Sequence, residues 1–229
     1  MRVILAEKPS VAQSIAAVLG ADQKKNGYLQ GENNLVSWCI GHLIELAPPE
    51  IYDARYAKWR REDLPIVPSA WESVVSDGTK KQFSVLKDLL NRTDVDEVVC
   101  ATDAGREGEL IFRMVYEKTG CTKPVKRLWI SSLEESAIRE GFRSLKPGTA
   151  YDALYRAALC RAQADWLVGI NGTRLYSRLY GIKLNVGRVM TPTLAMVAQR
   201  EKEIAALDST LAEKQDELET VQNRIDNFD

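Results

Sequence analysis

The chain has 229 residues, of which 45% are hydrophobic, and a formal net charge of −1. This composition excludes a protein that is disordered throughout. No apolar run approaches the roughly 18 residues that a membrane span needs, and the N-terminal nine residues are too short and too charged for a secretory signal. Four cysteines without paired spacing and a single histidine speak against a structural zinc site and favour reduced thiols in the cytoplasm.

Short apolar runs predict three buried strands, at residues 3–5, 95–101 and 127–130. Residues 28–40 have the pattern of a hairpin with its turn at 31–34, and 48–68 is expected to be irregular. Apolar residues spaced three or four apart predict helices between and after the strands, at 10–19, 80–90, 110–116 and beyond 132. Strands that alternate with helices indicate an α/β fold with a mainly parallel sheet.

From residue 151 onward the pattern is helical, with one helix over 151–180 and another from 192. Residues 151–200 have seven basic and two acidic side chains, whereas 201–229 have three basic and nine acidic, so the middle segment suits an anionic partner. The last segment has the 3–4 apolar spacing of a coiled-coil seam. Its members are Ile204, Leu207, Leu211, Leu218, Val221, Ile225 and Phe228, with Lys214 at the one polar position.

Three helix starts have capping signals, which are a capping box or an N-cap before proline. They are Ser10 with Gln13, Ser132 with Glu135, and Thr191 with Pro192.

Acidic residues follow two of the predicted strands. Glu7 comes directly after the first strand, and Asp103 and Glu107 follow the second. Because ligands of open parallel sheets lie at the carboxyl ends of the strands, we expect the three carboxylates to converge. Carboxylates brought together stay ionised only with a cation, and an all-oxygen set with few protein ligands suits Mg²⁺.

Glycines and basic residues accompany these acids. Gly105 and Gly108 are expected to let the loop turn sharply and approach a phosphate, and Lys8 and Arg106 add positive charge. Taken separately, residues 7–10 can also be a capped turn at a strand end, and residues 103–109 can also be a solvated loop.

Motifs distributed along the chain carry a family resemblance: ILAEKPS at 4–10, TDAGREGE at 102–109, WISSL at 129–133, ALCRAQADWLVG at 158–169 and VGRVMTPTL at 186–194. Together they resemble the toprim domain and the adjoining helical region of type IA DNA topoisomerases, most closely the topoisomerase III branch. The resemblance covers about residues 1–204 in uninterrupted order. It implies a Rossmann-like toprim domain at 1–150 and a partial helical DNA-binding domain at 151–204, followed by an acidic heptad helix at 205–229.

This family relaxes supercoiled DNA through attack of a tyrosine on a phosphodiester, strand passage and religation. The resemblance implies that Glu7 is the acid/base residue near the scissile phosphate and a metal ligand. Lys8 contacts that phosphate, and Asp103 and Glu107 hold Mg²⁺.

The resemblance implies further contacts to single-stranded DNA, made by Arg106, Arg161, Asp165 and Arg188, with Arg188 also in the catalytic set. Arg161 and Asp165 are four residues apart, so they share one helix face. Trp166 is expected either to stack on a base or to pack in the core. Arg156, Arg174 and Arg178 are expected either to contact DNA or to form a solvated face.

Two departures from the family pattern stand out. Gly105 replaces the middle acid of the metal motif, so one ion rather than two, or a weaker site, is expected. The tyrosine-bearing arch is missing, so the nucleophile is expected to be absent from this chain. A truncated natural protein, an excised fragment, and a subunit whose tyrosine lies on another chain all remain open.

The remaining expectations concern partners and rival functions. The heptad segment at 204–229 can self-associate or fold back on the helical region, and the family often has a helicase partner. No membrane association is expected. The rival functions are a metal-dependent toprim nuclease or primase-like enzyme, and a DNA-binding or partner-binding module without catalysis.

Overall fold

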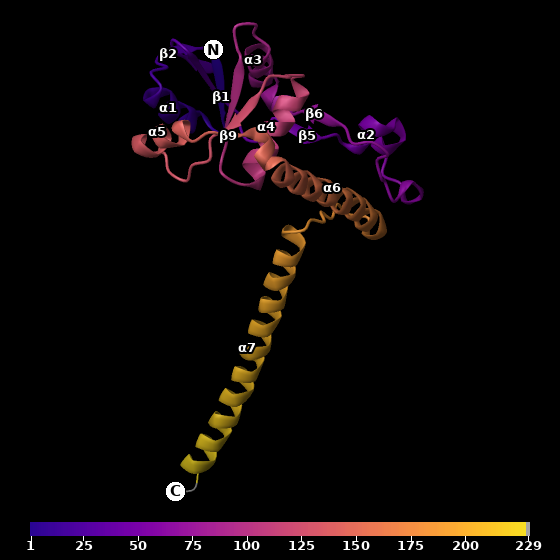
Figure 1. The fold of residues 1–229 in the computed structure, drawn as a ribbon. Helices are drawn as coiled ribbons and strands as arrows, with labels where there is room; N and C mark the ends of the chain where they lie inside the picture. The colour runs from indigo at the N-terminus through magenta and orange to yellow at the C-terminus, as the bar shows by residue number, and fades with distance from the viewer. Residues whose placement is uncertain (228–229) are drawn as a thin grey trace. The chain divides into compact units, whose positions relative to one another are not determined.

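The computed structural model describes residues 1–227 and has an α/β region followed by two long helices (Figure 1). Seven strands form one sheet in the order β2-β3-β4-β1-β7-β8-β9. Their bounds are β1 Arg2–Ala6, β2 Gln23–Lys25, β3 Tyr28–Gln30, β4 Asn34–Trp38, β7 Glu97–Ala101, β8 Val125–Arg127 and β9 Lys146–Pro147. A separate two-stranded sheet pairs β5 (Ile44–Leu46) with β6 (Ser73–Val75).

The centre of the large sheet is parallel. β1 lies between β4 and β7 and runs parallel to both, and β8 continues the parallel pairing on the far side of β7. The edges are antiparallel, since β2 and β3 pair antiparallel beside β4, and β9 beside β8. This arrangement confirms the predicted α/β fold, and the pairing of β3 with β4 confirms the hairpin.

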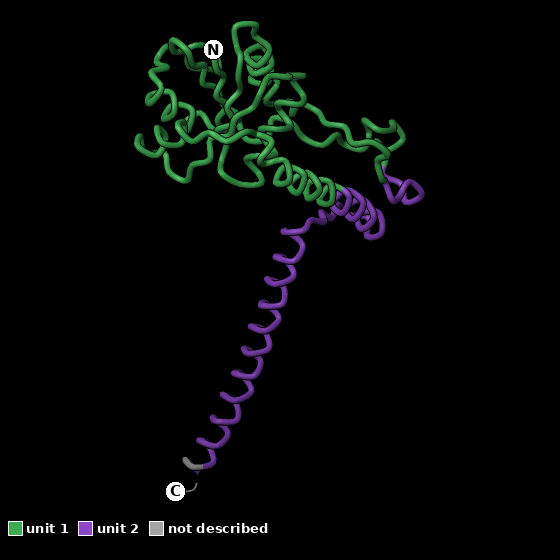
Figure 2. Tube along the Cα trace, in the orientation of Figure 1, with its two compact units in different colours: residues 1–58, 67–166 green, residues 59–66, 167–229 purple. Residues whose placement is uncertain are grey.

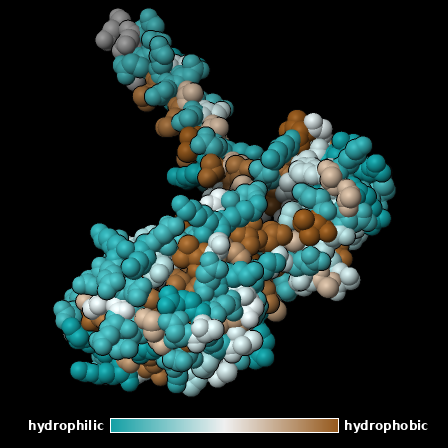
Figure 3. Space-filling model, turned by 90° about the horizontal axis from the view of Figure 1, so that it is seen from above, coloured by the Kyte–Doolittle hydropathy of each residue, from teal (hydrophilic) through white to brown (hydrophobic). Residues whose placement is uncertain are grey.

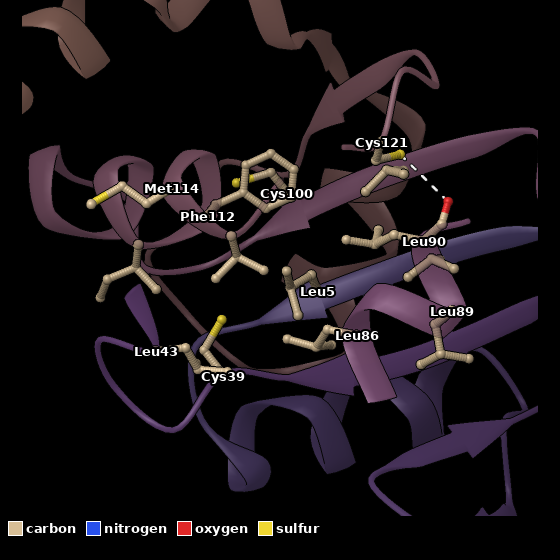
Figure 4. Close-up of a cluster of buried hydrophobic side chains, with 14 of the residues drawn as sticks. Leu5, Cys39, Leu43, Leu86, Leu89, Leu90, Cys100, Phe112, Met114 and Cys121 are labelled. Atoms are coloured by element: carbon tan, nitrogen blue, oxygen red, sulfur yellow. Dashed lines mark hydrogen bonds between the residues drawn. The ribbon is translucent and has the colours of Figure 1, made fainter. Parts of the chain in front are cut away.

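The alternation of side chains along the central strands builds a core on each face of the sheet. Val3 and Leu5 of β1 join one cluster, with Leu86 of α3 (Lys80–Leu90) and Phe112 of α4 (Arg106–Lys118). Figure 4 shows this cluster. Ile4 and Ala6 join the other cluster, beneath α1 (Pro9–Val18) and α5 (Glu135–Arg143). Helices therefore cover both faces, as a buried parallel sheet requires.

Several predicted boundaries differ from those observed. The third strand ends at Arg127 rather than at 130. The helix that follows Asp103 begins at Arg106, so part of the predicted acidic loop is helical. The predicted caps are wrong because helices start elsewhere: α1 has Lys8 at its N-cap, α5 has Glu134, and α7 starts at Met190. The irregular stretch contains α2 (Pro49–Tyr52) and short 3-10 turns.

The chain divides into two compact units, residues 1–58 with 67–166, and residues 59–66 with 167–229 (Figure 2). Helix α6 (Asp152–Tyr180) contributes to both. In the second unit, Asn171 accepts from the amide of Ile66 and donates to its carbonyl, at 2.6 and 2.9 Å. The division at residue 150 inferred from the sequence stays a prediction.

Helix α7 (Met190–Asp226) confirms the expected second long helix. The apolar seam side chains from Ile204 to Val221 are 41–72% exposed, and self-association and folding back both stay predictions. Phe228 of the predicted seam lies outside the described residues, as does the side chain of Ile225. No helix among residues 1–227 combines the length and apolarity that a bilayer crossing would demand.

Candidate functional site

The loop between β7 and α4 is fixed by its own backbone. The hydroxyl of Thr102 is buried and donates to the carbonyl of Gly108 at 2.7 Å. A Cβ atom on Gly108 would overlap the carbonyl of Asp103, so this glycine is needed for a close approach within the loop itself, and the approach to a phosphate stays a prediction. Gly105 has an extended backbone (φ −179°) and open space around it, so the predicted sharp turn at Gly105 is wrong, while the approach to a phosphate stays a prediction.

A buried ion-pair network lies beneath this loop. Glu109 and Arg127 are almost completely buried, and Arg127 Nε donates to Glu109 Oε2 at 3.0 Å. The other carboxylate oxygen accepts from Arg113 Nε, also at 3.0 Å. The guanidinium of Arg127 also donates to the carbonyls of Thr102 and Asp103, at 2.8 and 2.7 Å. Arg127 therefore holds the backbone of the acidic loop from below.

Arg113 extends the network toward α6. It donates to Asp152 Oδ1 at 2.8 Å and to the carbonyl of Gly148 at 2.7 Å. Burial disfavours its charged form, but the hydrogen bonds that Arg113 donates to Asp152 and Glu109 outweigh burial and raise the pKa of Arg113. The residues of this network are not among the predicted site residues; the available signal is Glu109 and Arg113, four residues apart, on either side of the apolar run 110–112.

On the open side of the loop the acidic residues form two groups. Glu7 follows β1, and Asp103 follows the adjacent, parallel β7. The backbone amide of Asp103 donates to Glu7 Oε2 at 3.2 Å. The structure therefore brings these two residues together across nearly one hundred positions of sequence, at the carboxyl ends of neighbouring strands.

Glu107 forms the second group. Its Oε1 lies 3.4 Å from Arg161, and its Oε2 lies 3.7 Å from His42 Nε2. Arg161 also lies 3.9 Å from Asp165 on the same face of α6. Within residues 1–227, described side chains provide no group of three acidic, His or Cys residues placed to hold a metal ion. The expected convergence of Glu7, Asp103 and Glu107 is therefore not observed, because Glu107 is directed toward Arg161 and His42.

Two cavities flank the acidic loop. One, of about 350 Å³, is lined by Asp103 with Val11 and Leu133. The other, of about 370 Å³, is lined by Glu107, His42 and Arg161. The loop thus presents Asp103 to one cavity, and the first turn of α4 presents Glu107 to the other.

The basic residues predicted to bind phosphate have different surroundings. Lys8 is exposed at the start of α1, and Arg106 is exposed at the start of α4. Arg188 is exposed in the second unit, in the segment between α6 and α7. That segment is attached to α6 by the Thr173 hydroxyl, which accepts from the amide of Val186 at 2.9 Å.

The structure packs Trp166 against its neighbours, and it buries Arg174, for which a solvated face is therefore wrong. Trp166 donates to the carbonyl of Ala47 at 3.0 Å and lies edge-on to Tyr52 and Trp71. Arg174 is buried, with its guanidinium 5.4 Å from the ring centre of Trp59. By contrast, Arg156 and Arg178 are exposed.

The cysteine thiols do not belong to the site. Cys39, Cys100 and Cys121 are buried and Cys160 is exposed. Burial raises the pKa of Cys100 to about 11 and also raises the pKa of Cys39.

Comparison with known proteins matches both parts of the chain. The Toprim domain family matches residues 2–133, and the DNA topoisomerase family matches residues 149–210. DNA topoisomerase 3 of Bacillus anthracis is 53% identical over 202 residues, which are 88% of this chain and 28% of that protein. The corresponding protein of Shouchella clausii is 54% identical over 203 residues, 89% of this chain and 28% of the relative.

Among solved structures, full-length topoisomerase I from Thermotoga maritima is similar, with a TM-score of 0.61 and 26% identity. The match covers 89% of this chain and 30% of that protein. The chain therefore spans less than a third of the length of these relatives.

Proposed function

We propose that this chain, which belongs to the toprim domain family and within it to the type IA DNA topoisomerases of the topoisomerase III branch, supplies the metal-binding and phosphate-binding part of a DNA strand-cleavage site. The observation that supports this best is the contact of Glu7 with Asp103 at the sheet edge, while Glu107 in the next helix pairs with Arg161. Carboxylates suit a hard cation, and a guanidinium suits a phosphodiester.

The donor chemistry of the site fits Mg²⁺. Glu7, Asp103 and Glu107 offer only oxygen ligands and none of them is buried. Mg²⁺ keeps several waters and needs one or two carboxylates together with phosphate oxygens. We assign the ion to these three residues, which requires the Glu107 carboxylate to turn from Arg161 and His42 toward Glu7 and Asp103; when bound, the ion would neutralise developing charge on the phosphate. With Gly105 in place of a fourth carboxylate, we propose one ion.

The protein residues have separate roles in this proposal. Glu7 exchanges a proton at the scissile phosphate, and Lys8 donates to that phosphate. Arg161 is paired with Glu107 in the structure. A phosphate that takes the guanidinium of Arg161 leaves the Glu107 carboxylate without that partner, so DNA binding and cation binding should support each other.

Contacts along single-stranded DNA are assigned to four residues: Arg106, Arg161, Asp165 and Arg188. The three cations neutralise phosphates, and Asp165 orients Arg161 through their contact on α6.

The complete reaction of cleavage, strand passage and religation is proposed for the enzyme to which this region belongs, with the nucleophilic tyrosine outside this chain. Burial raises the pKa of Tyr116 and Tyr155, which makes these two poor nucleophiles. Incubation with 5′-labelled single-stranded DNA and Mg²⁺, followed by a denaturing gel, should show no protein joined to DNA. A covalent adduct would contradict this assignment, and nicks with a free 5′ phosphate would support a metal-dependent nuclease.

The experiment that tests the binding proposal is fluorescence anisotropy with labelled single-stranded DNA over a salt series, with and without Mg²⁺. Affinity should fall steeply with salt, and Arg161→Ala should lower both the affinity and the salt slope, the latter by about 0.7 for one phosphate contact. The Mg²⁺ effect should be lost in Asp103→Ala/Glu107→Ala. An Arg156→Ala variant is the matched control on the same helix.

The exposed seam of α7 supports the second candidate, a partner-binding module without catalysis. Absence of DNA binding at every salt concentration would favour it. We further propose a cytoplasmic location, self-association through 204–229, and a helicase partner by analogy with the family.

A further inference from the structure

Helix α7 carries an apolar stripe that has no partner among the described residues. Every described side chain of α7 from Met190 to Arg224 is exposed. The stripe consists of Ile204, Leu207, Leu211, Leu218 and Val221, which are 41–72% exposed. In Figure 3 apolar side chains follow one another along the helix that ends at the grey atoms. In heptad notation Ile204, Leu211 and Leu218 occupy a positions, and Leu207, Lys214 and Val221 occupy d positions.

We propose that α7 binds α7 of a second copy of this chain as an antiparallel coiled coil, in the register that places Ile204 opposite Val221 of the other copy. The proposal goes beyond the DNA-binding function and does not depend on it.

The seam is self-complementary in this register. When the two copies run in opposite directions, Ile204 of one copy lies opposite Val221 of the other, Leu207 opposite Leu218, and Leu211 opposite Lys214. Each of these pairs occurs twice in the dimer. Lys214, the one polar seam position between residues 204 and 221, therefore faces leucine rather than a second lysine. The aliphatic part of Lys214 can cover Leu211 while its ammonium reaches the rim, where it already contacts Glu217 of its own helix at 2.6 Å.

The flanking charges favour the antiparallel direction. In an antiparallel pair, g positions of the two helices lie beside each other, as do e positions. The g positions pair Glu203 with Arg224 and Thr210 with Glu217. The e positions pair Asp208 with Gln215 and Glu201 with Gln222. The register thus contains two opposite-charge pairs and no like-charge pair among these positions.

A parallel dimer of the same helix would have like charges together. Its d positions would place Lys214 beside Lys214 and, two heptads upstream, Arg200 beside Arg200. Its g-to-e contacts would place Glu203 beside Asp208. Like charges at such close contacts are destabilising, so the charge pattern selects between two dimers that bury a similar apolar stripe.

The overlap is long enough for stable pairing. Residues 199–226 of one copy would lie beside residues 226–199 of the other, which is about four heptads and about 42 Å. A single exposed helix in water draws little stability from propensity alone, so the second copy would also stabilise α7 itself.

The first test is the molar mass of the whole chain by size-exclusion chromatography with light scattering. The wild type should be a dimer at micromolar concentration. Leu211→Glu places a charge in the seam and should give a monomer, whereas Ala212→Glu, on the outer face of the same helix turn, should leave the dimer intact. A wild type that stays monomeric, or a dimer that survives Leu211→Glu, would overturn the proposal.

Cysteine cross-linking tests the direction of the helices, in a Cys160→Ser background that removes the exposed native thiol. Mixed Leu207→Cys and Leu218→Cys chains should form a disulfide with each other. Leu218→Cys alone should not, because two copies of residue 218 would be about 16 Å apart along the axis. Rapid self-linking of Leu218→Cys would establish a parallel dimer and contradict the register.

Charge reversal gives an independent measurement with opposite signs for the two directions. Glu203→Arg should weaken an antiparallel dimer about fivefold, through two lost pairs of about 0.5 kcal/mol each, but should strengthen a parallel one. Glu203→Arg/Arg224→Glu should restore the wild-type dissociation constant. A single reversal that tightens the dimer would refute the antiparallel assignment.

Discussion

Glu107 and Glu109 are two residues apart in the first turns of α4, yet the protein surrounds them in opposite ways. The side chain of Glu109 is 1% exposed and both of its oxygens accept from arginines at 3.0 Å. The side chain of Glu107 is 55% exposed, and its contacts to Arg161 and His42 are long, at 3.4 and 3.7 Å. Glu109 belongs to a buried ion-pair network with Arg113 and Arg127, here called the floor. Glu107 belongs to the exposed acidic group, together with Glu7 and Asp103, here called the rim.

The difference separates structural charges from available ones. In the floor, Arg127 also donates to the backbone carbonyls of Thr102 and Asp103. The ion pair therefore fixes the position of the backbone at Asp103. In the rim, the contacts of Glu107 to Arg161 and His42 are long, and Glu7 accepts from a backbone amide, which leaves Glu7, Asp103 and Glu107 open to a cation. A rigid floor beneath an adaptable rim is the arrangement that a binding site needs.

Loss of the floor should have the largest effect. Arg127→Met keeps the length of the side chain but removes one of the two arginines that neutralise the buried Glu109 carboxylate and leaves its Oε2 without a donor, so the free energy of unfolding should fall by about 3–5 kcal/mol. Urea denaturation followed by circular dichroism measures this change. Arg127→Met/Glu109→Gln should recover part of the loss, and a single variant as stable as the wild type would show that the pair does not support the loop.

Alanine substitutions at Gly108 and Gly105 should have the next-largest effect on the free energy of unfolding, and the two should differ from each other. Gly108→Ala forces a methyl group into the Asp103 carbonyl and should cost about 1–3 kcal/mol, as overpacking does. Gly105→Ala enters open space on an extended backbone and should be neutral or stabilising by up to about 1 kcal/mol. Thermal unfolding of the pair checks this order, and equal losses at both positions would contradict the loop geometry.

A substitution in the rim should change the affinity for DNA rather than the stability of the fold. Glu107→Gln removes an exposed ion pair, so stability should change by less than about 1 kcal/mol. Without Mg²⁺, single-stranded DNA affinity should rise about two- to fivefold, because a negative charge beside Arg161 is removed. Anisotropy titrations in EDTA measure this rise; unchanged affinity would place the DNA away from Glu107.

A surface pair far from both regions gives the smallest effect. Hydrogen bonds from Arg92 lower the pKa of Asp94 from 3.8 to about 2. A carboxyl whose pKa is lower in the folded state adds stability above its unfolded pKa and loses it as pH falls from about 4 toward 2. Asp94→Asn should remove this small acid dependence. Acid titrations of both proteins followed by circular dichroism should diverge slightly below pH 4, and identical curves would show that the pair adds no stability.

The framework of the sheet was accessible from the sequence because its central strands are short apolar runs that report burial directly. Helix α3 matches its predicted range of 80–90, since three leucines lie on one face. The floor could not be predicted from the sequence, because the burial of Glu109 on α4 depends on Arg127 of β8. The direction of Glu107 was missed for the same reason, since Arg161 lies on a distant helix. Capping was misassigned because an N-cap depends on where the backbone turns, which side-chain spacing alone does not fix.

The length of α7 has a consequence for how the protein would hold nucleic acid. In the antiparallel pair, the two copies of residue 190 would be about 65 Å apart along the bundle. A DNA strand too short to reach both copies would bind with the affinity of one site. A longer strand would engage both, and the second contact would gain from a high effective concentration. The length of α7 would therefore set the shortest DNA strand that binds with avidity.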